Sequence, residues 1–189
     1  FILGVLLHPE NQAMPFPLIF TGPDASADYF EEIDQFIALT LGDQARSRYQ
    51  IIIDDPEGVA HAMRAGVERV REYRIETKDA FYYNWLMRID ESFQLPFEPT
   101  HEAMRQLGVS RALPKHELAA NLRRVFSAIV SGNVKANGIQ RIRQHGPFEI
   151  QGDAAIMQAL DQLLQRFVRQ DRMKLPGGTA YEPCYRIVS

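Results

Sequence analysis

Two stretches decide the fold of this chain: Pro17-Leu18-Ile19-Phe20-Thr21-Gly22-Pro23 and Tyr49-Gln50-Ile51-Ile52-Ile53-Asp54-Asp55-Pro56. Each is an apolar run that ends in turn residues, which is typical of a buried strand of a parallel sheet. The residues between them, 26–41, carry apolar side chains at spacings of three and four and predict a helix that Gly42 ends. A further helix is expected from Pro56 to Tyr73. Strands that alternate with helices across short loops predict an α/β fold with a parallel sheet.

The chain is expected to hold only the C-terminal half of a Rossmann-like domain. Phe1–Leu7 (FILGVLL) is an unbroken apolar run with no N-cap residue ahead of it, as if the sequence began inside a helix. We therefore expect the natural start, and the N-terminal half of the sheet, to lie upstream.

After residue 78 the pattern changes to that of a mainly helical domain. Charged residues interrupt the apolar periodicity, and an aromatic cluster, Phe81 to Trp85, follows. We predict a partial nucleotide-binding domain over 1–78 and a mainly helical C-terminal domain over 79–189. Helices are expected after Lys115 and after Asp153, with Gly132 and Gly138 interrupting or ending the first, and a short final strand over 185–188.

Composition excludes several classes of protein. The 189 residues carry a formal net charge of -3, which argues against a nucleic-acid-binding surface. The single cysteine, Cys184, rules out an intramolecular disulfide or a cysteine-based zinc site and fits a reducing cytoplasm. No apolar run approaches the roughly 20 residues that cross a bilayer, and Phe1–Leu7 lacks the features of a signal peptide. We expect no metal, membrane or nucleic-acid partner.

Two groups of residues are candidates for nucleotide binding. Ligands of open α/β sheets sit at the carboxyl ends of the strands, which points to Thr21, Gly22 and Asp24; a turn with a helix cap explains the same residues equally well. His8, Glu10 and Asn11 offer groups that could hydrogen-bond a sugar or base, although a solvated loop that ends a helix is the preferred interpretation.

Three other features favour structural interpretations. Asp54 and Asp55 could bind metal or ribose, but capping of the next helix explains them more simply. The string Pro176-Gly177-Gly178-Thr179 is interpreted as a turn, because no clear helix follows it. The basic residues of the central helical region could hold a phosphorylated ligand or an acidic partner, and a solvated helix face is the favoured alternative; they are Arg123, Arg124, Lys135, Arg141, Arg143 and His145.

Several strings resemble the bacterial pyrimidine/purine nucleotide 5′-monophosphate nucleosidases, whose catalytic domain is of the LOG, or lysine-decarboxylase-like, type. In the first region they are Leu7-His8-Pro9-Glu10-Asn11, residues 17–23 and Ile53-Asp54-Asp55-Pro56. Strings similar to that family's C-terminal domain are Ala119-Ala120-Asn121-Leu122-Arg123-Arg124, Gly132-Asn133-Val134-Lys135, His145-Gly146-Pro147-Phe148-Glu149 and Arg172-Met173-Lys174-Leu175-Pro176-Gly177-Gly178.

The resemblance implies hydrolysis of the N-glycosidic bond of nucleoside 5′-monophosphates without a cofactor. It also implies a homo-oligomer and control by guanosine alarmones. The family's PGGxGTxxE motif is absent and is expected before Phe1, so no catalytic residue is assigned here and the chain alone is expected to be catalytically incomplete. The alternative is a nucleotide-binding regulatory or oligomerisation module without catalytic activity of its own.

Overall fold

The computed structural model describes residues 1–79 and 87–188 and divides the chain into two compact units. The N-terminal unit is Ile2–Glu91, and the C-terminal unit is Ser92–Ser189 together with Phe1. Both contain helices and short parallel strands, which confirms the α/β class. The aromatic cluster of residues 81–85 lies outside the described residues. The division after Glu91 is structural, and the domain boundary at residue 78 stays a prediction.

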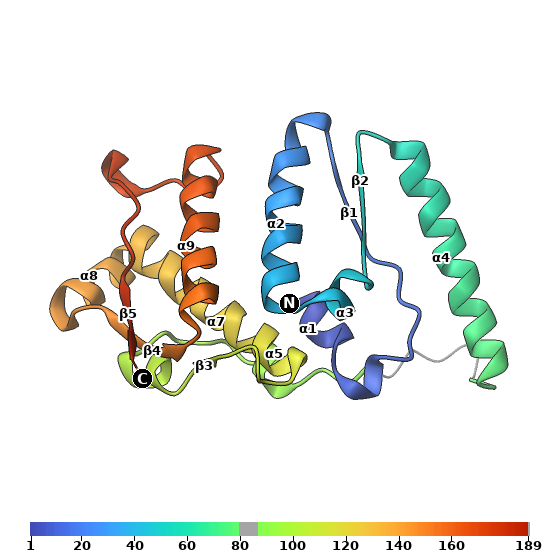
Figure 1. Cartoon of the computed structure of the whole chain (residues 1–189), viewed down its shortest axis with the longest axis horizontal. Coiled ribbons are helices and arrows are strands. Elements are labelled where there is room, and N and C mark those ends of the chain that lie inside the picture. The colour runs from blue at the N-terminus through green and yellow to red at the C-terminus, as the bar shows by residue number, and fades with distance from the viewer. Residues whose placement is uncertain (80–86, 189) are drawn as a thin grey trace. The chain divides into compact units, whose positions relative to one another are not determined.

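The N-terminal unit is built around two parallel strands, β1 (Ile19–Gly22) and β2 (Gln50–Ile53), paired in register from Ile19 opposite Gln50 to Gly22 opposite Ile53. The strand pair lies between the helices α2 and α4 (Figure 1). The helical elements of the unit are α1 (Ile2–Leu6), the 3-10 turn η1 (Pro9–Asn11), η2 (Asp24–Ser26), α2 (Ala27–Thr40), α3 (Asp43–Arg46) and α4 (Pro56–Glu76). The predicted alternation of helices and parallel strands is therefore confirmed.

Side-chain contacts hold α2 and α4 against the strand pair. The ring of Phe20 in β1 stacks on Phe30 of α2 with a centroid separation of 6.2 Å. On the other side, Gly66 of α4 is buried against Pro17, and an added Cβ would lie 2.5 Å from the proline Cβ. A larger residue at position 66 would push the helix away from the chain that leads into β1.

The C-terminal unit packs helices on a three-stranded parallel sheet of order β3-β4-β5. Its buried residues include Leu118, Val125 and Ile129 of α7 and Ile156, Leu160 and Leu164 of α9. The predicted final strand is β5, but β3 and β4 were not predicted. The elements are α5 (Glu91–Gln94), α6 (His101–Arg105), β3 (Gly108–Val109), α7 (Lys115–Val134), α8 (Ala136–His145), β4 (Phe148–Gly152), α9 (Ala154–Arg169), η3 (Pro176–Gly178) and β5 (Tyr185–Val188).

The predicted break of the central helix is misplaced. Gly132 lies inside α7, which continues to Val134, and the break is at Lys135, whose backbone is extended. Gly138 lies in the first turn of α8 and does not interrupt it. A Cβ there would come within 2.2 Å of the Ser131 carbonyl oxygen, so this glycine allows α8 to approach the backbone of α7 closely.

Two tyrosines anchor the last strand to α9. The hydroxyls of Tyr181 and Tyr185 donate to opposite oxygens of the Asp161 carboxylate, at 2.5 and 2.6 Å. Burial, and then the hydrogen bond to Asp161, raise the pKa of both phenols far above the ordinary value. The last strand, β5, is thus fixed by polar contacts as well as by its pairing with β4.

Candidate functional site

The carboxyl ends of β1 and β2 form the edge at which the sequence predicts a ligand. Because the two strands are parallel, Gly22 and Ile53 end at the same edge. Thr21 and Gly22 are the last two residues of β1, which corrects the expectation that they follow the strand. Thr21 and Asp24 are exposed there. A threonine hydroxyl, a carboxylate and exposed backbone therefore lie close together at this edge.

Gly22 and Asp54 shape that edge. A Cβ on Gly22 would lie 2.3 Å from the Ser26 hydroxyl oxygen, so the tight passage from β1 into η2 requires glycine. The Gly22 carbonyl accepts a hydrogen bond of 2.9 Å from the Asp54 backbone N–H. Asp54 itself has φ +52°, a left-handed conformation that aspartate tolerates better than most residues.

Asp55 performs the capping role that its sequence position predicts. Its Oδ1 accepts a hydrogen bond of 2.8 Å from the Gly58 backbone N–H, and Pro56 occupies the first turn of α4. The cap supplies a negative charge at the helix N-terminus, where it is favourable. Asp54, like Asp24, is exposed at this edge.

His8, Glu10 and Asn11 lie at the other end of the strands. Arg48, which precedes β2, donates from its guanidinium to the Gln12 carbonyl at 2.9 Å, and this places the loop after η1 beside the amino ends of the strands. The structure therefore does not bring this group together with Thr21, Gly22 and Asp24. His8 Nδ1 accepts a hydrogen bond from the Glu10 backbone N–H, which forms a cap of η1.

Asn11 is fully buried, and its side chain bonds within the protein. Its Nδ2 donates to the carbonyls of Val5 and Arg88, both at 2.7 Å, and its Oδ1 accepts from the Arg88 backbone N–H at 2.9 Å. These three bonds join α1 to the segment after residue 86. The carboxamide is a structural bridge in this unit.

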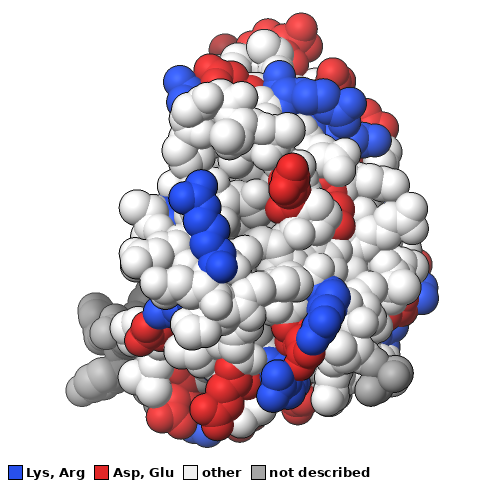
Figure 2. All heavy atoms as spheres, turned by 90° about the vertical axis from the view of Figure 1, so that its left-hand side faces the viewer, with Lys and Arg blue, Asp and Glu red and all other residues white. Residues whose placement is uncertain are grey.

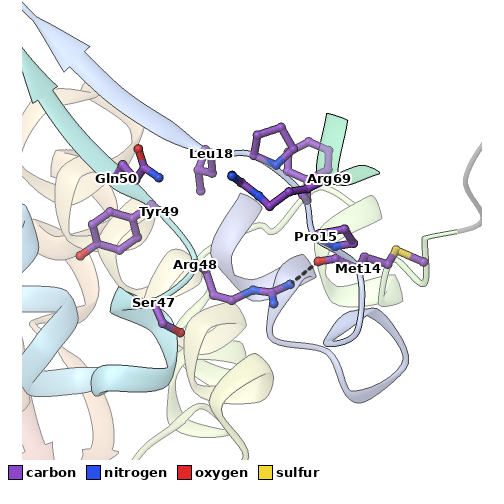
Figure 3. Close-up of a pocket in the computed structure, with 10 residues that line it drawn as sticks. Met14, Pro15, Leu18, Ser47, Arg48, Tyr49, Gln50 and Arg69 are labelled. Atoms are coloured by element: carbon purple, nitrogen blue, oxygen red, sulfur yellow. Dashed lines mark hydrogen bonds between the residues drawn. The ribbon is translucent and has the colours of Figure 1, made fainter. Parts of the chain in front are cut away.

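A pocket of about 170 Å³ opens at the amino ends of β1 and β2, within the N-terminal unit (Figure 3). Sequence reasoning did not find it, because its walls come from three separate segments. They are residues 14–18, residues 47–50 and Arg69 of α4. It is smaller than the roughly 300–1,000 Å³ of pockets that enclose whole ligands of drug size.

The basic residues of the C-terminal unit are partly engaged by their own unit. Arg123 donates to the Ser92 carbonyl at 2.9 Å, and Arg141 donates to the Pro99 carbonyl and pairs with Glu98 at 2.8 Å. On the face shown in Figure 2, basic and acidic side chains are interspersed, and no large area of one sign is visible. This arrangement agrees with the favoured interpretation as a solvated face.

Glu149 of β4 is paired with two basic side chains. It pairs with Arg186 of β5 and with Arg105 of α6, the latter at 2.7 Å. The hydrogen bonds from Arg186 and then Arg105 hold the pKa of the Glu149 carboxyl below its usual value. Glu149 thereby links a strand, its neighbour and a helix.

Neither a metal site nor a membrane span is found among the described residues. Residues 1–79 and 87–188 contain no cluster of three or more His, Cys, Asp or Glu side chains arranged to hold a metal ion. Among the helices of the same ranges, none combines the length and the apolar character needed to span a membrane.

Comparison with known proteins identifies the family. The profile of the family described as "Pyrimidine/purine nucleotide monophosphate nucleosidase, C-terminal" matches residues 67–188, more than half of the chain. The chain belongs to this family. The match to the nucleosidase C-terminal family begins within α4 and includes every element of the C-terminal unit from α5 to β5.

Curated relatives extend the similarity over the N-terminal unit. The chain is 51% identical over 187 residues to the pyrimidine/purine nucleotide 5′-monophosphate nucleosidase of Escherichia coli K12, and equally to those of strains O6:H1 and O157:H7. The aligned region covers 99% of this chain but 41% of each relative. The chain thus spans less than half the length of the nucleosidases it matches.

Proposed function

We propose that the natural full-length protein hydrolyses the N-glycosidic bond of purine and pyrimidine nucleoside 5′-monophosphates, yielding free base and ribose 5-phosphate. The observation that carries this proposal is the 51% identity over 99% of the chain to proteins named as nucleotide 5′-monophosphate nucleosidases. A similarity of that extent covers the strand edge as well as the C-terminal unit. The proposal includes the LOG-type character of the N-terminal domain and a cytoplasmic location.

The reaction needs three kinds of group. The transition state resembles an oxocarbenium ion, so its positive charge must be stabilised. The attacking water needs a carboxylate that orients or activates it. The 5′-phosphate needs backbone N–H groups or cations that bind its oxygens. We assign Thr21, Gly22 and Asp24 to one wall of the nucleotide site, because they lie at the carboxyl edge of the parallel strands. The resemblance assigns the catalytic tasks to a PGGxGTxxE motif, which residues 1–189 do not contain.

His8, Glu10 and Asn11 enter the proposal as more distant contributors. They lie near the amino ends of the strands, and the side chain of Asn11 is occupied by three internal hydrogen bonds. Their contribution would therefore act through the placement of α1 rather than through direct contact of Asn11 with substrate.

The activity is tested on the purified natural full-length protein. Incubation with AMP, GMP, CMP and UMP, followed by chromatography, is expected to show release of free base and of ribose 5-phosphate. The substitution Thr21→Val removes the hydroxyl at nearly constant volume and is expected to lower kcat/KM about tenfold if the hydroxyl contacts the bound nucleotide. Thr77→Val, at the far end of α4, is the matched control. If the protein released base from none of the four nucleotides, the assignment would be refuted.

We also infer that the protein is a homo-oligomer and that its C-terminal unit has a regulatory role, in keeping with the resemblance to alarmone-controlled nucleosidases. In the alternative function, the same C-terminal unit would serve as a regulatory or oligomerisation module with no catalytic role. The feature that supports a regulatory role is the presence of exposed cationic side chains, Lys135 and Arg143, on and beside α8.

Size-exclusion chromatography with light scattering measures the oligomeric state with and without a guanosine tetraphosphate. Assays of base release under the same two conditions measure the regulatory response. Double substitution Lys135→Gln and Arg143→Gln is expected to weaken the response of activity to the alarmone while basal hydrolysis persists. An unchanged response in the double variant would exclude these two side chains as the effector contacts.

A further inference from the structure

The pocket at the amino ends of β1 and β2 carries positive charge that no acidic residue balances. Two of its lining residues, Arg48 and Arg69, are cationic, and none of the ten is an aspartate or glutamate. Arg48 is partly buried and Arg69 is exposed, and cationic groups gathered in one concave site attract anions. An excess of two positive charges in one small pocket therefore indicates a site for an anion.

Over residues 1–79 and 87–188, the guanidinium of Arg48 bonds only to neutral partners. Its guanidinium donates to the carbonyl oxygens of Gln12 and Met14, at 2.9 and 3.1 Å, and more weakly to that of Asn11; the bond to Met14 is drawn in Figure 3. Burial lowers the pKa of this side chain, in agreement with a cation that has lost part of its hydration and has gained no counter-charge. Arg48 therefore holds the loop of residues 11–14 in place, and its positive charge is not neutralised by these carbonyl partners.

Arg69 supplies the donors that remain free. Its side chain extends from α4 toward the wall formed by Leu18 and Gln50 (Figure 3). Within the described residues, no hydrogen bond or ion pair engages its guanidinium. A planar guanidinium with free donors binds carboxylate or phosphate oxygens in a two-pronged manner.

The opposite wall is made by one continuous segment of the chain. Met14, Pro15, Phe16, Pro17 and Leu18 form it, and Gln50 adds an exposed carboxamide beside Arg69. The volume of about 170 Å³ is too small to enclose a whole nucleotide. Most of the accessible surface of the pocket is polar, so the pocket suits a small polar molecule that carries one anionic group.

We propose that this pocket is a second binding site, separate from the carboxyl edge of the strands, for a small organic anion whose carboxylate or phosphate is bound by Arg69. The site goes beyond the proposed nucleosidase activity and does not depend on it. Arg48 contributes electrostatic attraction from behind its carbonyl partners, and the chain from Met14 to Leu18 contacts the rest of the bound molecule.

The test uses the natural full-length protein and three small probes: benzoate, phenyl phosphate and benzamide. Binding is followed by nuclear magnetic resonance of the arginine Nε–H groups and of the backbone amides of residues 47–50. At least one anionic probe is expected to bind and to shift the Arg69 signal, and the neutral benzamide is expected to bind at least tenfold more weakly. Which anion binds more tightly tells whether the site prefers carboxylate or phosphate.

Matched variants decide the role of Arg69. Arg69→Gln is expected to weaken anion binding at least tenfold, whereas Arg64→Gln, which removes the same charge from an exposed position of the same helix, is expected to change it less than twofold. Both variants are exposed substitutions, and their thermal melting verifies that the fold persists. The proposal is overturned if neither anion binds, if benzamide binds as tightly as the anions, or if both variants bind the anions alike. Because no readout is catalytic, loss of nucleosidase activity would not be mistaken for loss of this site.

Discussion

Replacing Asn11 by alanine is expected to destabilise the N-terminal unit strongly, because the carboxamide is fully buried and makes three hydrogen bonds of 2.7, 2.7 and 2.9 Å. A neutral hydrogen bond contributes about 1 kcal/mol net, and a buried group left unpaired costs about 1–3 kcal/mol. Asn11→Ala removes the side-chain partners of the Arg88 carbonyl and N–H, and it leaves the Val5 carbonyl with one donor, the His8 N–H at 3.2 Å. The expected loss in the free energy of unfolding is therefore about 3–5 kcal/mol, a large part of the total stability of an ordinary domain.

The measurement is urea unfolding of the natural full-length protein followed by circular dichroism, with hydrogen exchange to identify the unit that opens. Exchange in α1 and in the strand pair is expected to accelerate, while exchange in α7 and α9 stays unchanged. Gln12→Ala is the control, because that side chain is exposed and makes one long bond of 3.3 Å to the Leu7 carbonyl. It is expected to cost less than about 1 kcal/mol.

Asn11→Asp separates the hydrogen bonds from simple packing. The substitution keeps the volume but exchanges the donating amide for an oxygen that faces the Val5 and Arg88 carbonyls. At pH 7 it is expected to destabilise the unit at least as much as alanine does. A cost below about 1 kcal/mol for Asn11→Ala, with a change confined to substrate KM, would refute the structural role and favour direct binding of nucleotide.

Three further predictions concern the C-terminal unit. Gly138→Ala is expected to cost about 1–3 kcal/mol or more by forcing α8 away from α7, measured by urea unfolding. Cys184, whose pKa burial raises to about 11, is expected to react with a thiol reagent at pH 8 only after the unit unfolds, so rapid modification of the native protein would contradict its burial. The pKa of Glu149 is lowered by Arg186 and Arg105, so its stabilising contribution is present above the ordinary carboxyl value of 4.5 and is lost as the pH falls through the lowered value. Melting temperatures between pH 3 and 6 are therefore expected to depend less on pH in Glu149→Gln.

The N-terminal unit was predictable because its signals are local. The runs that became β1 and β2 are apolar and end in turn residues, and the apolar spacing of α2 gives its buried face. Even so, sequence placed Thr21 and Gly22 after the strand, since turn residues can also occupy the last positions of a short strand. The ends of elements depend on pairing with a neighbour, which a single stretch does not encode.

In the C-terminal unit the missed features depend on contacts between distant residues. β3 has two residues, too few for any periodicity, and exists because Gly108 and Val109 pair with β4. The alternation of buried Phe148 and Ile150 in β4 was visible in the sequence and could have predicted that strand. Gly138 was interpreted from its low helix propensity, whereas its position is explained by the approach of another helix.

Among the candidate sites, too, those that depend on local sequence could be predicted and those that depend on distant residues could not. The carboxyl edge follows from the strand order, so Thr21 and Asp24 could be proposed from sequence. The burial of Asn11 could not, because its partner Arg88 is 77 residues away. The pocket likewise joins Met14, Ser47 and Arg69, whose proximity arises from the packing of α4 beside β1.

The paired phenols of Tyr181 and Tyr185 give the C-terminal unit a built-in optical reporter. Phenolate absorbs ultraviolet light at longer wavelength than phenol, and both groups are kept from ionising while they share the Asp161 carboxylate. In an alkaline titration, the exposed tyrosines would ionise first, and these two would follow only when β5 separates from α9. A step in the absorbance record would thus mark detachment of the last strand without any label or added dye.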